Sequence, residues 1–426
     1  MPITSRHVTS VKDAKTQLIG HGCMPFGAGG ISTAYLQVQG RMPFKVFGRS
    51  SARAVQLLSP AGYYINSSGV KTNIPQAMVY EVAIERGDGF VSAAERVTWS
   101  AANTITINPG DDPHLSDVWV TTAGDLTPGW HYVRYNITVA TAVTGISLGG
   151  QLANGTSNHK VVGWTAGGAA SQVLGVGAIT NSGGNTSLTF GITPFAILGK
   201  LDYLYPAVLL NGDSICEGSN NTAGDGLMNR SFYQMGCFYN DVPWVYCGRY
   251  ATLASQWAGG SMLNIVKILA PYCTHFISQT GFNDVNSGRT SAQILTDRAT
   301  IRAGVKAANP YIKTIECSIT PHSTDASNNW ITGSSAVGGT QIVVAAWDTG
   351  GVVPTFNAAI PTVADGFMDA CSFMQDPVYP GIFKVQTVSG AATKITNDGT
   401  HVVDNLTSQI LGGALANKLK PLLVAA

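Results

Sequence analysis

Charged residues are scarce in this chain: they make up 12% of its 426 residues, and the formal net charge is +1. An average globular protein carries roughly twice that share. A protein that binds nucleic acid shows a clear basic excess, so the composition argues against nucleic acid as a partner. Because 45% of the residues are hydrophobic, the low charge does not indicate a disordered chain.

The sequence also has no apolar run long enough to cross a membrane. Runs such as residues 207–210 and 342–347 fall far short of the roughly 20 residues that a spanning helix needs. We therefore expect no membrane partner. Residues 1–7 hold no apolar signal core, which suggests a cytoplasmic chain, a removed signal or release by a route such as lysis. The low charge together with 49 glycines favours an extracellular or virion-associated setting.

Paired cysteines are missing as well. The seven cysteines are scattered with no CxxC spacing, and an odd number leaves at least one without a partner in the chain. Neither a zinc cluster nor a dense disulfide framework is indicated, so most cysteines are expected to be buried thiols. We predict no metal and no organic cofactor. Oligomeric state is not specified by these features.

The first half of the chain has the pattern of an all-β unit. Short strand-like segments such as residues 103–107 and 131–137 alternate with Gly/Pro turns such as residues 109–113. Other strand candidates are residues 97–99, 117–120 and 188–192. Regularly spaced short strands are typical of a sandwich or jelly roll. We predict such an accessory domain over residues 1–199.

After residue 200 the pattern changes to alternating strands and helices. Continuous apolar runs, expected for strands covered on both faces, occur at residues 206–210, 244–247, 275–278, 312–319 and 368–373. Between them, Thr290 or Ser291 can cap a helix that ends before Pro310, and a last helix is expected to stop before Pro421. This order predicts an α/β domain with a parallel sheet over residues 200–426.

Three short polar segments lie where strands of this sheet should end. They are Gly212-Asp213-Ser214-Ile215, Gly281-Phe282-Asn283-Asp284 and Asp398-Gly399-Thr400-His401. Ligands of parallel sheets bind beyond the carboxyl ends of the strands. Together the segments offer a serine, an imidazole, a carboxylate and an amide donor, which are the groups that acyl transfer requires.

These segments resemble the blocks of the SGNH, or GDSL, hydrolase family. The resemblance covers roughly residues 205–426, and Cys216 departs from the threonine usual there. It implies a flavodoxin-like three-layer fold. The family's second block, a glycine after the second strand, matches Gly259 or Gly260; Gly259 is preferred because the residues that follow it fit the family's polar-then-aliphatic run.

The resemblance also implies a role for each residue. Ser214 would attack an ester carbonyl, His401 would accept its proton, and Asp398 would orient the imidazole. The oxyanion would be held by the N–H groups of Ser214 and Gly259 and by the side-chain amide of Asn283. Asp213 and Asp284 are expected to support these loops.

Several of these residues could also have ordinary structural roles. Ser214 alone would be an ordinary turn serine or helix cap, and His401 an ordinary surface histidine. Cys216 is an alternative nucleophile, although its position two residues after the serine favours the core. Trp257 and Trp330 are either core residues or a platform for a sugar ring. The tryptophans of the first half, Trp99, Trp119, Trp130 and Trp164, are expected mostly in the core.

The function expected from these residues is ester hydrolysis, with O-deacetylation of a polysaccharide as the leading form. An acetylated glycan would then be the substrate, and the first half could contact it. One alternative is a glycan-binding or virion structural protein with a weak or vestigial hydrolase site. Another is a lipase or thioesterase of the same family.

Overall fold

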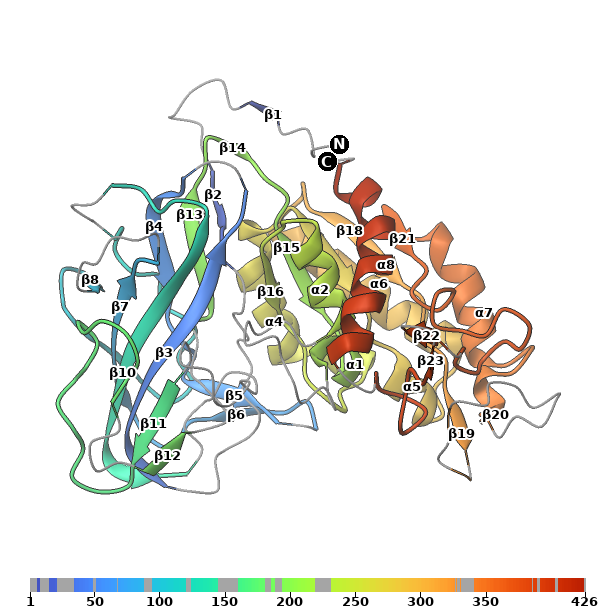
Figure 1. Ribbon diagram of the computed structural model, residues 1–426, viewed down its shortest axis with the longest axis horizontal. Helices are drawn as coiled ribbons and strands as arrows, with labels where there is room; N and C mark the ends of the chain where they lie inside the picture. The colour runs from blue at the N-terminus through green and yellow to red at the C-terminus, as the bar shows by residue number, and fades with distance from the viewer. Residues whose placement is uncertain are drawn as a thin grey trace.

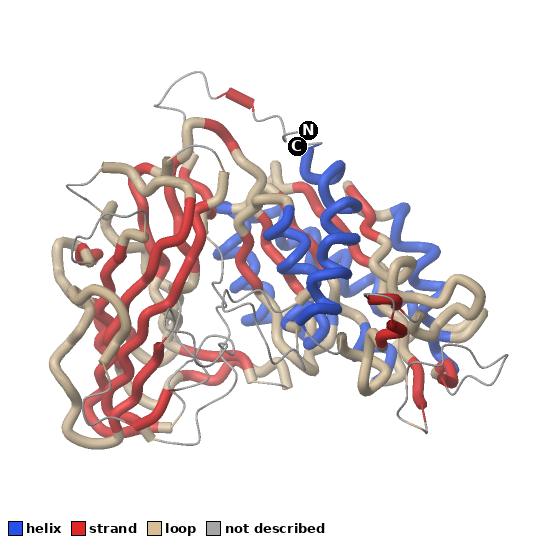
Figure 2. The backbone as a smooth tube through the Cα atoms, viewed as in Figure 1, coloured by secondary structure: helices blue, strands red, loops and turns tan. Residues whose placement is uncertain are grey.

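The computed structural model describes residues 6–7, 15–20, 34–48, 51–66, 68–87, 94–119, 124–144, 160–180, 185–187, 194–218, 231–325, 327, 330, 341–384, 386–388, 391–402 and 405–424. The strand candidate at residues 188–192 lies outside them. In Figure 2 one half of the described chain consists of strands and loops, and the other half contains the helices together with further strands. The first described helix begins at Ser214.

Among the described residues, the first half contains two larger antiparallel sheets and a two-stranded hairpin of β5 (Tyr63–Ile65) and β6 (Lys71–Asn73). The larger has the order β12-β11-β3-β10-β7-β8, with β9 also paired to β7, and the smaller has the order β2-β13-β4. Their strands are β2 (Thr16–Leu18), β3 (Tyr35–Val46), β4 (Arg53–Leu58), β7 (Met78–Glu85), β8 (Glu95–Val97), β9 (Ile105–Ile107), β10 (Gly129–Val143), β11 (Lys160–Trp164), β12 (Asn185–Ser187) and β13 (Ala196–Lys200). Buried residues of both sheets belong to one hydrophobic core. Two packed antiparallel sheets agree with an all-β unit, and the jelly-roll connection stays a prediction.

Several sequence predictions for this half can be compared with the strands. Residues 131–137 lie within β10, and residues 105–107 form β9. Residues 117–119 form no strand, although Trp119 N–H donates to the Val55 carbonyl at 2.7 Å. Asp117 N–H donates to the Thr98 carbonyl at 2.8 Å, so the bonds of this segment go to two different neighbours and do not form one ladder. Trp99, Trp119 and Trp164 are buried, whereas Trp130 is half-buried.

The second half is built on a five-stranded parallel sheet, as predicted. Its order is β16-β15-β17-β18-β21, and all four pairings are parallel. The strands are β15 (Val208–Asn211), β16 (Trp244–Tyr246), β17 (His275–Ser278), β18 (Lys313–Cys317) and β21 (Gly366–Met368). Numbered along the chain this order is 2-1-3-4-5, which is the flavodoxin-like arrangement.

Helices cover the parallel sheet. One group contains α2 (Phe232–Tyr239) and α8 (Asn405–Val424), and the other contains α3 (Ala254–Trp257), α4 (Gly260–Leu269), α6 (Ser291–Ala308) and α7 (Val352–Ala359). Figure 1 shows α2 and α8 on the side of the sheet nearer the viewer. The helix predicted at Thr290 is α6, and Thr290 caps it. The helix expected to stop before Pro421 instead continues to Val424.

The two halves share a continuous core. Phe47, which follows β3, places its ring 5.7 Å from that of Trp244 and 6.1 Å from that of Phe238. Beside it, Lys45 Nζ lies 3.0 Å from Asp241 Oδ1. The antiparallel pairing of β13 runs to Lys200 and the parallel sheet begins at Val208. The division into units at residues 199 and 200 stays a prediction.

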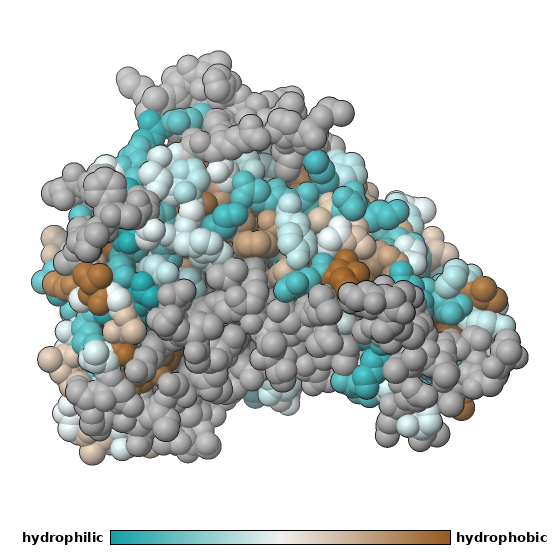
Figure 3. Space-filling view, viewed as in Figure 1, coloured by the Kyte–Doolittle hydropathy of each residue, from teal (hydrophilic) through white to brown (hydrophobic). Residues whose placement is uncertain are grey.

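Exposed apolar residues are scattered over the described surface. On the face in Figure 3, brown apolar residues of the described part form small separate spots among hydrophilic ones. None of the helices in the described part of the chain is both long and apolar enough to span a bilayer.

Candidate active site

Ser214 lies at the carboxyl end of β15, on the first turn of the short helix α1 (Ser214–Glu217). Asp213 caps this helix, because its Oδ1 accepts the Ile215 N–H at 3.0 Å. The turn is tight: a Cβ on Gly212 would lie 2.4 Å from the Cβ of Cys216 and 2.6 Å from Gln279 Oε1. Only glycine fits there, so Gly212 allows the strand to turn into the helix and present Ser214 at the sheet edge.

A chain of hydrogen bonds joins Ser214, His401 and Asp398. His401 Nε2 lies 2.8 Å from Ser214 Oγ, and His401 Nδ1 lies 2.7 Å from Asp398 Oδ2. An ionised carboxylate only accepts hydrogen bonds, so the proton of the neutral ring is on Nδ1. The lone pair of Nε2 therefore faces the serine hydroxyl. The serine and the histidine are 187 residues apart in sequence.

The turn that carries Asp398 and His401 is tied together locally. Asp398 Oδ1 accepts the backbone N–H groups of Thr400 at 2.9 Å and His401 at 2.8 Å. Burial by itself would raise the pKa of Asp398. The hydrogen bonds from the His401 side chain and backbone outweigh it and hold that pKa well below its usual value. Asp398 is therefore ionised at neutral pH and able to stabilise an imidazolium.

Asn283 lies beyond the end of β17, on the helix α5 (Phe282–Asn286). The backbone reaches it through Gly281, whose φ of 122° favours glycine. Asn283 Nδ2 donates one hydrogen bond, to the Thr252 carbonyl at 3.2 Å. An amide nitrogen has two N–H donors, so one remains for another acceptor.

The two expected supporting aspartates are both buried. Asp284 Oδ2 accepts the Ala254 N–H at 2.7 Å, which ties α5 to the loop after β16. Burial raises the pKa of Asp284 and raises that of Asp213 to about 6. Asp213 N–H donates to Gln279 Oε1 at 3.1 Å. Both residues therefore hold backbone segments next to Ser214 and Asn283.

Gly259, the sequence-based choice for an oxyanion donor, lies in a different setting. It precedes α4 as its N-cap, and its N–H donates to the Gln256 carbonyl at 3.4 Å. That donor is occupied within the turn between α3 and α4, so the geometry does not favour it. Gly260 has a φ of 56° and starts α4.

Ala251 is the candidate that the sequence analysis missed. It follows β16 with a φ of 61°, a left-handed conformation rare for alanine. Its neighbour Thr252 accepts the Asn283 amide, and Arg249 N–H two residues before it donates to the Gly212 carbonyl at 3.1 Å. These contacts hold the Ala251 loop between Ser214 and Asn283. In the described part of the chain no acceptor is recorded for the N–H of Ala251 or of Ser214.

Cys216, Trp257 and Trp330 are all buried, which tests the other roles suggested for them. Cys216 is buried, and burial raises the pKa of its thiol well above the usual value, so it is a poor nucleophile. Trp257 is fully buried and donates Nε1–H to Thr252 Oγ1 at 2.9 Å. Trp330 is 4% exposed. Neither tryptophan offers a ring face to a sugar, so the platform interpretation is wrong for both.

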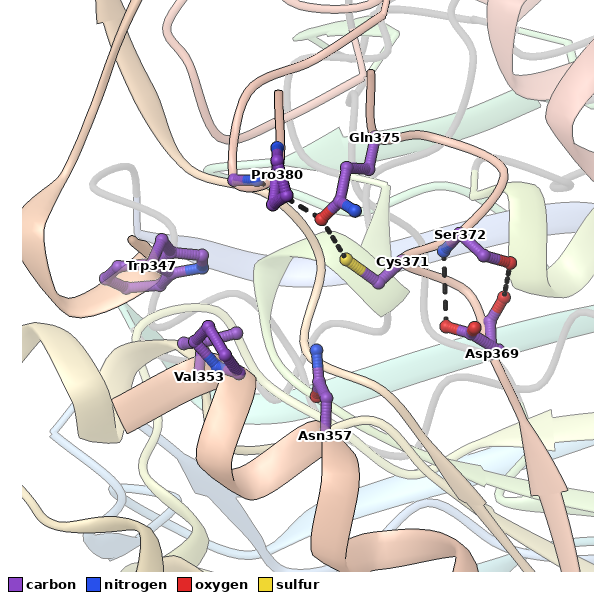
Figure 4. Close-up of a pocket in the computed structure, with 10 residues that line it drawn as sticks. Trp347, Val353, Asn357, Asp369, Cys371, Ser372, Gln375 and Pro380 are labelled. Atoms are coloured by element: carbon purple, nitrogen blue, oxygen red, sulfur yellow. Dashed lines mark hydrogen bonds between the residues drawn. The ribbon is translucent and has the colours of Figure 1, made fainter. Parts of the chain in front are cut away.

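A cavity of about 220 Å³ lies along the same sheet edge, beyond β18 and β21. In Figure 4, Trp347, Val353 and Asn357 line one side, facing Cys371, Gln375 and Pro380. Ser318 Oγ, after β18, donates to Asp369 Oδ1 at 2.9 Å and so joins the ends of both strands. None of the residues that line the cavity belongs to the Ser214–His401–Asp398 chain.

No metal site was found among the residues that the structure describes: they contain no group of three or more His, Cys, Asp and Glu side chains able to hold an ion. No cofactor is expected for chemistry at this site, because serine supplies a nucleophile and the imidazole with its carboxylate supplies a base.

No family model matches the chain, and no curated protein matches it. Solved structures that resemble it include carbohydrate esterases and a lipolytic protein. A carbohydrate acetylesterase from Sinorhizobium meliloti is 17% identical, with 51% of this chain and 99% of that chain covered and a TM-score of 0.34. A G-D-S-L family lipolytic protein from Desulfitobacterium hafniense is 15% identical, with coverages of 50% and 99% and a TM-score of 0.33.

A third solved structure is similar along nearly the whole chain. It is a family two carbohydrate esterase from Clostridium thermocellum in complex with cellohexaose, 10% identical, with coverages of 99% and 98% and a TM-score of 0.35. At these identities and TM-scores the likenesses define neither the family nor the substrate of this chain. The geometry of Ser214, His401 and Asp398 carries the function.

Proposed function

We propose that this protein is a serine esterase of the SGNH type, with Ser214 as its nucleophile. The observation that carries the proposal is the chain of two short hydrogen bonds from Ser214 Oγ through His401 to Asp398. A serine hydroxyl is a weak nucleophile unless a base beside it takes its proton. In this site the lone pair of His401 Nε2 faces the hydroxyl at hydrogen-bonding distance.

The reaction follows from these positions. Ser214 Oγ attacks the ester carbonyl carbon while its proton passes to His401 Nε2. The tetrahedral intermediate collapses, the alcohol leaves with the proton from His401, and the acyl group stays on Ser214. Water then attacks the acyl carbon while His401 Nε2 accepts its proton. The second intermediate collapses, Ser214 Oγ leaves and takes that proton back from His401, and the carboxylic acid is released. Asp398 stabilises the imidazolium in both steps.

The negative oxygen of the intermediate needs hydrogen-bond donors. In this proposal they are the N–H groups of Ser214 and Ala251 and the second N–H of Asn283 Nδ2. Ala251 replaces Gly259, whose N–H is bonded to Gln256. Backbone donors held by a folded loop need no rearrangement when charge develops, and each is worth about 10²–10³ in turnover.

We further propose an acetylated carbohydrate as the substrate. This part rests on the family resemblance of the three segments and on the antiparallel half attached to the esterase half. Ester hydrolysis itself does not depend on it. An extracellular or virion-associated setting also stays a proposal.

The test uses p-nitrophenyl acetate with the wild type and Ser214→Ala. We expect wild-type turnover and a loss of at least about 10³-fold in the variant. Equal rates would contradict the esterase proposal and favour a glycan-binding or structural role. Acetate release from a panel of acetylated polysaccharides then tests the substrate. Long-chain p-nitrophenyl esters and acyl thioesters are the comparison arms, and faster turnover of either would favour a lipase or a thioesterase.

A further inference from the structure

The turn that carries Asp398 and His401 rests on the segment after β18. The Gly399 carbonyl, between the two residues, accepts hydrogen bonds from His322 Nδ1 at 2.9 Å and from Ser323 N–H at 3.2 Å. A carbonyl only accepts hydrogen bonds, so His322 carries its proton on Nδ1. The same nitrogen lies 3.1 Å from Thr400 Oγ1.

The fit at this contact is close. Gly399 has a φ of 74°, and a Cβ on it would lie 1.8 Å from the Ser323 carbonyl oxygen and 2.8 Å from Cη2 of Trp330. A side chain at this position would therefore push the turn away from its support. Because Gly399 has no side chain, the turn lies directly against Ser323 and Trp330.

His322 is itself fixed by packing. Its ring lies 5.1 Å from that of Phe282 and 4.8 Å from that of Trp347, both in T-shaped contacts. Its backbone N–H donates to the Gly381 carbonyl at 3.1 Å. Burial lowers the pKa of His322, so the ring is neutral at neutral pH, with its proton shared between Gly399 and Thr400.

We propose that His322 is a positioning residue for the esterase reaction. Its Nδ1–H fixes the Gly399 carbonyl and thereby holds Asp398 and His401 in line with Ser214. Its ring also packs on Phe282, the neighbour of Asn283, so one side chain supports both the base and the oxyanion amide. This inference rests on the proposed esterase function.

The discriminating experiment compares two amide variants. His322→Asn places an amide N–H near the position of Nδ1, whereas in His322→Gln the amide lies one bond further out. Both lose the ring, so they differ mainly in where the donor lies. A misplacement of about 1 Å costs on the order of 10²-fold in rate.

With p-nitrophenyl acetate we expect kcat of His322→Gln to fall roughly 10- to 100-fold with little change in KM, and His322→Asn to keep most of its kcat. Equal losses in the two variants would overturn the inference, because a packing role depends on the ring that both lack. His322→Phe, which keeps a ring and has no donor, provides a third variant if His322→Gln does not fold. It should be as slow as His322→Gln, and wild-type kcat in it would also overturn the inference.

A readout independent of turnover separates this inference from the esterase proposal. The downfield proton resonance of His401 Nδ1–H, bonded to Asp398, reports the position of the turn even in an inactive protein. We expect the resonance in wild type and His322→Asn and its loss in His322→Gln. An inactive wild type would refute the esterase proposal, while an unchanged resonance in His322→Gln would overturn the positioning role.

Discussion

At the scale of single residues, the three members of the proposed triad differ in their exposure. Ser214 is 9% exposed, the His401 side chain 20% and the Asp398 side chain 39%. The nucleophile is thus the most enclosed and the orienting carboxylate the least. Asp398 nevertheless stays ionised, because its oxygens accept hydrogen bonds from His401 Nδ1 and from the backbone N–H groups of His401 and Thr400.

Replacing Asp398 by Asn tests the orienting role. An amide can donate its N–H to His401 Nδ1 and so move the ring proton to Nε2, where it faces Ser214 and blocks the base. We expect kcat to fall by roughly 10³–10⁴ with the fold intact, as measured by ester turnover and circular dichroism. A variant within tenfold of wild type would mean that Asp398 does not set the tautomer.

Asn283→Ala tests the oxyanion donor. The variant removes the free N–H proposed for the oxyanion, and with it the bond to Thr252. We expect kcat to fall about 10²–10³-fold while stability falls by only about 1 kcal/mol. Asn283→Asp is the matched control: it keeps the shape, cannot donate when ionised, and should be at least as slow. Normal turnover in either variant would remove Asn283 from the site.

The sequence was informative about residues where chemistry and strand ends coincide, as at Ser214, Asn283 and His401. For the backbone oxyanion donor after the second strand it suggested Gly259, whose N–H donates to the Gln256 carbonyl. Our proposal is Ala251, which has a left-handed backbone and lies five residues after the last residue of β16. The sequence did offer one signal for Ala251: it lies in the loop directly after the predicted second strand, and such loops form the ligand site of parallel sheets. The support by His322 depends on contacts that local sequence does not reveal.

At the scale of elements, β17 contains a buried titratable group. His275 is fully buried at the start of β17, the middle strand of the parallel sheet, with Nδ1 2.8 Å from Thr274 Oγ1. Burial and the charge of Lys313 lower its pKa from 6.5 to about 4. The folded chain therefore keeps this ring neutral in a pH range where the unfolded chain protonates it.

This difference predicts acid sensitivity of the fold. Between pH 6.5 and pH 4 the unfolded state binds the extra proton, so stability falls as the pH decreases through that window. From His275 alone we expect a loss of about 2 kcal/mol between pH 7.5 and pH 5. Urea unfolding of wild type and His275→Asn at both pH values measures it, since the variant lacks the titration. Parallel pH dependence in the two proteins would contradict the assignment.

Elements were predictable where one physical signal dominated. Continuous apolar runs identified four of the five parallel strands, and capping at Thr290 identified the start of α6. The fifth run, residues 368–373, meets β21 only at Met368 and otherwise follows it as a turn. Proline was a weaker signal: α8 includes Pro421 because only the last turn follows it. Near a helix end the missing N–H removes one hydrogen bond without interrupting the rest of the helix.

At the scale of the whole molecule, the antiparallel half and the esterase half are packed through Phe47. Its ring is 1% exposed and contacts Phe238 and Trp244. Sequence composition divided the chain into two halves but did not reveal this contact, because it joins residues about 190 positions apart.

Phe47→Ala should therefore destabilise the protein by about 3–5 kcal/mol, through lost burial and the cavity left between the halves. Lys45→Met is the matched control. It removes the partly exposed pair with Asp241 and the contacts of Nζ with the Phe47 and Phe238 rings, at 4.6 and 5.0 Å, but leaves both rings in place. It should cost about 1–2 kcal/mol, less than Phe47→Ala. Urea unfolding measures both. Equal and small effects would mean that the halves do not depend on this contact.

The central claim is that His401 activates Ser214, and covalent labelling tests it most directly. A fluorophosphonate transfers its phosphonyl group to an activated serine oxygen with loss of fluoride, and tandem mass spectrometry locates the product. We predict modification of Ser214 in the wild type, and loss of that modification in His401→Ala and in the denatured chain. Absence of labelling in the folded wild type, or labelling of Ser214 that persists without His401, would contradict the claim.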